Sequence, residues 1–232
     1  MENDIKVEID EEIYQQIIEN LMSIFDKSIV LLFLGPPASG KGTQVVKIKK
    51  IIEKKSDNNT IIITTGDLCK EFLKSETIPQ KVIDVLRRRM NDEGKLFPNH
   101  VKVHLWVNNL FTKLKDPDKD NIIFDGSPRD VEEAEELVRA LSFWGRKYIV
   151  VKFNVPDDEL IRRIKAKDRG RDDDKGDVPI KRIGEYNSKL PNLLNFFERK
   201  KIPVVEVNAE GDIEEVFKKN SWQLKFASYK LK

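Results

Sequence analysis

The chain has 232 residues, with 42 Lys and Arg against 40 Asp and Glu, so its net charge is +2 when both histidines are neutral. A hydrophobic content of 39% beside 35% charged residues is typical of a globular protein and excludes disorder throughout. The balanced charge indicates no nucleic-acid-binding face, because such a face needs clustered basic residues.

The cysteine count and the first few residues indicate the cellular compartment of the protein. Cys69 is the only cysteine, which excludes an internal disulfide and a zinc site built on cysteine pairs. No apolar run approaches the roughly 18 to 20 residues that cross a bilayer. Residues 1–4 are acidic rather than basic, and Glu2 stands where N-myristoylation requires glycine. We expect a cytoplasmic monomer with no membrane contact.

Residues 1–28 form the first predicted element, an amphipathic helix. Its apolar side chains recur at helical spacing, at Ile13, Ile17, Ile18, Leu21, Met22 and Phe25. Two interpretations stay open: this helix packs on the core, or its apolar stripe binds a protein partner.

Beyond residue 28, short apolar runs alternate with helical segments. The runs lack polar alternation, which predicts strands covered on both faces, at residues 29–34, 61–63, 122–124, 148–155 and 204–207. The predicted helices are residues 42–55, 79–91, 101–114, 131–143, 158–167, 180–200 and 213–220. This order predicts an α/β fold with a five-stranded parallel sheet between helices and with ligands at the carboxyl ends of the strands.

A glycine-rich segment follows the first predicted strand and opens a helix, Gly35-Pro-Pro-Ala-Ser-Gly-Lys-Gly-Thr-Gln44. In this context glycines let backbone N–H groups turn toward an anion, the helix N-terminus adds positive potential, and Lys41 reaches the terminal phosphates. The segment predicts a nucleoside triphosphate site. Because Gly42 follows the lysine, the hydroxyl of Thr43 comes one position late, and direct metal ligation by Thr43 stays open.

Further motifs follow in order: TTGDL at 64–68, GKL at 94–96, DGSPR at 125–129, GRDDD at 170–174 and NAEG at 208–211. Together with residues 40–44, they resemble the adenylate kinase family of nucleoside monophosphate kinases, from about residue 29 to 220. The resemblance implies a P-loop NTP hydrolase-type fold of three α/β/α layers. It also implies phosphoryl transfer from ATP to a nucleoside monophosphate, with ATP and Mg²⁺ as cofactors and small-molecule nucleotides as partners.

The resemblance also implies a division of the chain into parts. These parts are an N-terminal helical extension (1–28), a core domain (29–66, 95–164 and 180–232), a monophosphate-binding lobe (67–94) and a short lid (165–179). Closure of both lobes would exclude water from the reacting groups.

Cations dominate the implied site, because two phosphate chains must be brought together in line. By resemblance Arg129 holds the acceptor phosphate, and Arg163, Arg171 and Arg182 gather with Lys41 around the transferring group. The implied donor site consists of Gly35, Ala38, Ser39, Gly40, Lys41, Gly42, Thr43 and Gln44, with Asn208 and Ala209 beside the donor adenine. The implied acceptor site consists of Thr65, Gly66, Lys70, Arg129, Glu133, Arg171 and Arg182.

Two further roles follow from the resemblance. Asp125, at the end of a predicted strand, would orient the water shell of Mg²⁺, although a strand-end aspartate that caps a turn is the alternative. Thr65 favours adenine, because relatives that prefer pyrimidines carry a small apolar residue there.

Several positions depart from the family pattern. Ala38 stands where glycine is usual, and at positive φ its methyl group would cause a strain of roughly 1 kcal/mol. Lys70 and Lys167 replace arginines, which keeps the charge but loses the planar fork that binds phosphate. Ser127 replaces an aromatic residue.

Glu133 is the sharpest departure, because family members that use AMP carry glutamine there. A carboxylate only accepts hydrogen bonds and would face the lone pair of an adenine ring nitrogen, a loss of about 1 to 3 kcal/mol. Guanine, with two adjacent donors, would fit it better. The other interpretation is that Glu133 belongs to a solvated acidic face with Glu132, Glu135 and Glu136.

The sequence therefore predicts an adenylate kinase-type phosphotransferase that converts MgATP and AMP into two ADP. Two alternatives remain. One is the same chemistry on another monophosphate such as GMP, motivated by Glu133. The other is a nucleotide-binding protein of low activity, motivated by the changes at Ala38, Lys70, Ser127 and Lys167.

Overall fold

A computed structural model describes residues 28–55, 57–91, 97–166, 177–212 and 215–216. Its sheet confirms the predicted strands, which are β1 (Val30–Leu34), β2 (Thr60–Thr64), β3 (Asn121–Asp125), β4 (Ile149–Asn154) and β5 (Val204–Asn208). All neighbours are parallel, in the order β2-β3-β1-β4-β5. Because β1 lies in the centre, the loop that follows it opens at the middle of the sheet.

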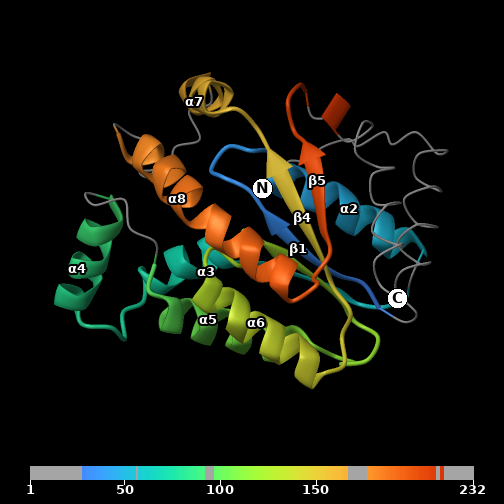
Figure 1. The fold of residues 1–232 in the computed structure, drawn as a ribbon. Helices are drawn as coiled ribbons and strands as arrows, with labels where there is room; N and C mark the ends of the chain where they lie inside the picture. The colour runs from blue at the N-terminus through green and yellow to red at the C-terminus, as the bar shows by residue number, and fades with distance from the viewer. Residues whose placement is uncertain (1–27, 56, 92–96, 167–176, 213–214, 217–232) are drawn as a thin grey trace.

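Helices cover both faces of the sheet, as predicted (Figure 1). They are α2 (Lys41–Lys55), α3 (Thr65–Phe72), α4 (Gln80–Asn91), α5 (Asn99–Lys113), α6 (Val131–Phe143), α7 (Asp157–Ala166) and α8 (Val178–Arg199). The α2 helix packs on one face, and α5, α6 and α8 pack on the other. The predicted three-layer α/β/α fold is confirmed.

The α3 helix was not predicted. Its N-cap residue, Thr64, makes no side-chain capping bond, and Gly66 in its first turn disfavours a helix. Burial compensates, because Thr65 and Cys69 pack inward from this helix. Burial also raises the pKa of the Cys69 thiol to about 11, so the thiol stays protonated and serves packing.

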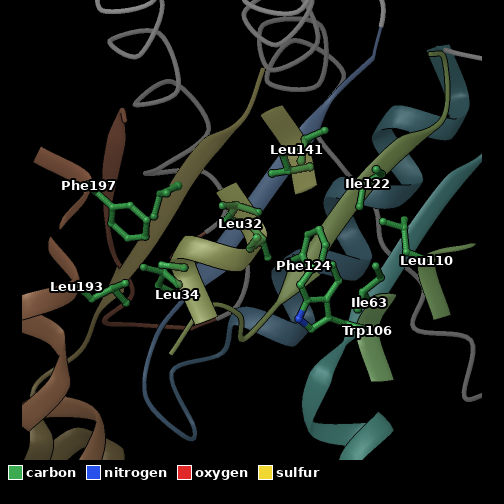
Figure 2. Packing of buried hydrophobic residues seen from close by; sticks show 14 of the residues in the cluster. Leu32, Leu34, Ile63, Trp106, Leu110, Ile122, Phe124, Leu141, Leu193 and Phe197 are labelled. Carbon is green, nitrogen blue, oxygen red and sulfur yellow. The ribbon is translucent and has the colours of Figure 1, made fainter. Parts of the chain in front are cut away.

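The strands are apolar on both faces because each face supports its own core. Leu31 and Phe33 point toward α2, whereas Leu32 and Leu34 point toward the opposite helices. Figure 2 shows this second core, in which Trp106 meets Phe124 edge to face with ring centroids 5.6 Å apart. This double coverage explains why the strands read as continuous apolar runs.

Some predicted segments lie outside the described residues. They are the helix within residues 1–28, most of the lid at 165–179 and most of the helix at 213–220. The domain division therefore stays a prediction. Within the described part of the chain, none of the helices has the length and apolarity of a membrane span.

We predict that Leu137→Ala lowers the free energy of unfolding by about 2 to 5 kcal/mol, because Leu137 on α6 is fully buried and truncation leaves a cavity. Urea denaturation followed by circular dichroism measures this loss. The control is Glu136→Ala, an exposed neighbour expected to change stability by no more than about 0.5 kcal/mol. Equal effects of both variants would contradict the assigned core.

Candidate active site

The glycine-rich loop turns sharply between β1 and α2. The Ser39 N–H donates to Pro36 O at 3.3 Å, and the N–H groups of Thr43 and Gln44 donate to Gly40 O at 3.1 and 3.3 Å. These bonds close the loop around the N-terminal end of α2, where the positive end of the helix dipole favours an anion.

Tight packing favours glycine at the start of the loop. A Cβ added at Gly35 would lie 2.7 Å from Ser39 Oγ and 3.0 Å from Phe153 Cβ, so these neighbours would have to shift. Ser39 itself is 1% exposed, and its hydroxyl has no hydrogen-bond partner among the described atoms. A buried, unpaired hydroxyl in a loop of this type is available to a phosphate oxygen.

Ala38 adopts a φ of +62° and Gly40 a φ of +83°. The backbone strain predicted for Ala38 at positive φ is therefore present, because a Cβ disfavours this left-handed region. Ala38 thus adopts a conformation that glycine adopts without strain.

Lys41, Asp125 and Arg129 converge in front of this loop. A Cβ added at Gly126 would lie 3.4 Å from Lys41 Cε and 3.2 Å from Arg129 Nη2. A Cβ added at Gly42 would lie 3.3 Å from Asp125 Oδ2. Lys41 Nζ donates to Pro36 O at 3.1 Å, which places the ammonium group at the mouth of the loop.

Asp125 is suited to a water-bound cation. Its carboxylate is half-buried and makes no hydrogen bond or ion pair with the described residues. The described part of the chain holds no cluster of three candidate metal ligands. A single carboxylate beside a phosphate site fits Mg²⁺, which keeps most of its water and shares phosphate oxygens.

The residues predicted for the acceptor lie on α3 and beside it. A Cβ added at Gly66 would lie 3.8 Å from Arg129 Nη2, so the start of α3 faces that guanidinium group. Arg129 Nε donates to Gly126 O at 2.8 Å. Lys70 is half-buried, and its ammonium group lies 3.5 Å from the Asp67 carboxylate.

Arg163 borders both the phosphate loop and the loop after β5. Its Nε donates to Glu159 at 2.7 Å and its Nη2 to Ala209 O at 2.8 Å, so it bridges α7 and the loop after β5. Hydrogen bonds from Arg162 and Arg163 lower the pKa of Glu159 to about 2. A Cβ added at Gly40 would lie 4.0 Å from Arg163 Nη1, so the guanidinium group lies between the phosphate loop and the loop after β5.

The predicted donor-base loop follows β5. The Ala209 side chain is buried, its N–H donates to Asn154 O at 2.9 Å, and its carbonyl accepts from Arg163. These bonds hold the loop against β4 and α7. Asn208 and Glu210 line a cavity of about 450 Å³ between α8 and the ends of β4 and β5.

Arg182 is placed by its helix. It lies one turn before Tyr186 on α8, and the charge of Arg129 acts on the Tyr186 hydroxyl, whose pKa burial raises. Arg182 therefore lies on the same face of α8 as Tyr186. Arg171 and Lys167 lie outside the described residues.

Both interpretations of Glu133 are wrong. Glu133 is fully buried rather than solvated, and its carboxylate lies 2.7 Å from Lys102 Nζ, with no face turned to a base. Its backbone N–H bonds the capping Asp130 side chain at 3.0 Å. Burial acts to raise the pKa of Asp130, but that bond and the Lys102 charge outweigh it, so the pKa is lowered.

Lys102 lies behind the site and was not among the residues predicted from the sequence. Lys102, Trp106 and Leu110 form one buried stripe along α5. A lysine at helical spacing with buried apolar residues needs a buried carboxylate, and this pattern is visible in the sequence.

A phosphate loop at the centre of a parallel sheet, facing lysine, arginine and carboxylate groups, is typical of P-loop nucleotide-binding proteins. Residues 33–202 match the adenylate kinase family. The chain is 30% identical to an adenylate kinase of Bacteroides thetaiotaomicron over 190 residues, 81% of this chain and 93% of that protein. It is 33% identical to an adenylate kinase of Leptospira biflexa over 190 residues, which cover 80% of this chain and 94% of that protein. The chain belongs to the adenylate kinase family.

We predict that Ala38→Gly raises the free energy of unfolding by about 0.5 to 1 kcal/mol, because it removes the methyl group from a left-handed residue. Urea denaturation measures the change. The control is Ala140→Gly within α6, expected to lose about 1 kcal/mol. A loss at position 38 as large as that at 140 would show that Ala38 is unstrained.

Proposed function

We propose that this chain transfers the γ-phosphoryl group of ATP, bound with Mg²⁺, to AMP and forms two ADP. The observation that carries the proposal is the convergence of Lys41, Asp125 and Arg129 around Gly126, at the mouth of the phosphate loop. The matched relatives, which are named adenylate kinases, support the same reaction.

The arrangement suits an in-line displacement. An acceptor phosphate oxygen forms a bond to the γ-phosphorus while the bond to the β–γ bridging oxygen breaks, and that oxygen keeps the electron pair. A monophosphate carries a charge of about −1.5 to −2 at pH 7, so its oxygen needs no general base. Catalysis then rests on positioning and on charge neutralisation.

Each side of the site has a task in this mechanism. The loop N–H groups and Lys41 bind the donor phosphates, and Arg129 holds the acceptor phosphate opposite them. Asp125 would hold the water shell of bound Mg²⁺, which would supply positive charge that offsets the phosphates. Arg182 joins from α8, and we propose that Arg171 joins from the lid.

We predict that Lys41→Met lowers kcat by about 10²- to 10³-fold, because a charge aimed at the transferring phosphoryl group is lost. A coupled ADP-release assay measures this. The circular dichroism spectrum stays unchanged, because methionine keeps the aliphatic stem of a half-buried residue. The control is Lys49→Met, further along the same helix and paired with Glu53. Normal turnover by folded Lys41→Met protein would refute the proposed site.

The pairing of Glu133 with Lys102 removes the reason to favour guanine. The charge that would have repelled an adenine ring nitrogen is neutralised inside the protein. Thr65, which by resemblance favours adenine, begins α3, and the next residue, Gly66, faces Arg129.

We therefore expect AMP to exceed GMP, CMP and UMP by at least about tenfold in kcat/KM, the discrimination that one matched polar contact supplies. Parallel assays with these acceptors and dAMP, at fixed ATP, measure the ratios. GMP as the best acceptor would restore the guanine alternative. A kcat far below about 1 s⁻¹ with every acceptor would instead favour the low-activity nucleotide-binding protein.

A further inference from the structure

A buried charge pair next to the acceptor side has no part in the mechanism above. The Lys102 and Glu133 side chains are 2% and 0% exposed, and Lys102 Nζ lies 2.7 Å from Glu133 Oε2. The pair joins α5 to α6, directly behind the loop that carries Arg129.

Glu133 accepts more than this one bond. The Arg129 N–H donates to Glu133 Oε2 at 2.9 Å, and the Ser127 hydroxyl donates to Glu133 Oε1 at 2.8 Å. The carboxylate thus holds the backbone of Arg129 in place. Both of its oxygens are engaged, so neither is available to a base.

The chain of hydrogen bonds extends from Glu133 to α3. An ionised carboxylate cannot donate, so the single hydroxyl proton of Ser127 goes to Glu133. The Thr65 hydroxyl, which is hydrogen-bonded to Ser127, must then be the donor of that bond. The connected set Lys102, Glu133, Ser127 and Thr65 therefore ties the first turn of α3 to the loop of Arg129.

Such a network is a poor device for stability alone. Removing two charges from water offsets most of their attraction, and apolar side chains of similar size often serve as well. What a fully hydrogen-bonded network supplies is one defined geometry, because each partner left unpaired is strongly unfavourable. Here the defined geometry is that of Arg129 and Thr65, two residues of the proposed acceptor site.

We propose that Lys102 and Glu133 are positioning residues that fix Arg129 and Thr65 for the acceptor monophosphate, without reading its base. This inference rests on the proposed function. In this inference Glu133 forms a charge-neutral pair with Lys102 inside the protein and supports Arg129, instead of contacting the base.

A double-mutant cycle with Lys102→Met, Glu133→Gln and both changes tests the proposal. Each single change leaves one charge buried without its partner, and we expect the KM for AMP to rise at least about tenfold, with the KM for ATP within about twofold. The double variant has no unpaired charge, and its amide oxygen still accepts from Arg129, so we expect the KM for AMP within about threefold of the parent value.

Two further variants keep the test decisive if a single variant fails to fold. Ser127→Ala removes one donor and leaves the ion pair, and we expect a rise of about threefold or more in the KM for AMP. Lys119→Met breaks the exposed pair with Asp116, 3.0 Å apart, and controls for loss of a lysine; we expect no change in either KM.

Three results would overturn the inference. One is an unchanged KM for AMP in folded single variants. Another is an equal rise for AMP and ATP, which indicates a merely structural role. The third is a changed AMP-to-GMP ratio, which makes Glu133 a reader of the base.

Calorimetric titration of AMP against the parent protein separates this inference from the proposed function. Binding without turnover refutes the proposed reaction, and the cycle is then read from the dissociation constants. If AMP shows no binding and no turnover, the proposed function and this inference are both refuted.

Discussion

Parallel pairing of three neighbouring strands is the constraint on which the site depends. Phe33 of β1 and Thr64 of β2 are both in register with Asp125 of β3. The Gly126 N–H then donates to Phe33 O at 3.0 Å. Three loops must therefore leave the sheet at one level, and they bring the phosphate loop, α3 and Arg129 together although they lie far apart in the sequence.

That juxtaposition concentrates charge, and the protein handles the two signs differently. Lys41 and Arg129 reach the mouth of the loop, where two phosphate chains would neutralise them. Glu133, which would oppose those chains, is withdrawn into the interior and neutralised by Lys102. The pocket thus keeps an excess of positive charge, which in-line phosphoryl transfer requires.

The departures from the family pattern are absorbed by the fold in different ways. Ala38 adopts the left-handed φ that the loop requires at its position. Ser127, in place of an aromatic residue, links Thr65 to Glu133 and becomes part of an internal network. Both changes are compatible with the convergence of Lys41, Asp125 and Arg129 around Gly126.

The sequence alone determined the strands, their parallel arrangement and the phosphate loop, because apolar runs and glycine spacing are local patterns. It also indicated the strain at Ala38, which depends only on the path of one loop. It missed α3, because that helix is stabilised by burial rather than by its own propensity. The surroundings of Glu133 and Arg163 were decided by tertiary structure, because the partner of a charged group is whichever residue the fold brings near. Lys102 lies 31 positions from Glu133, and only the packing of α5 against α6 makes them a pair.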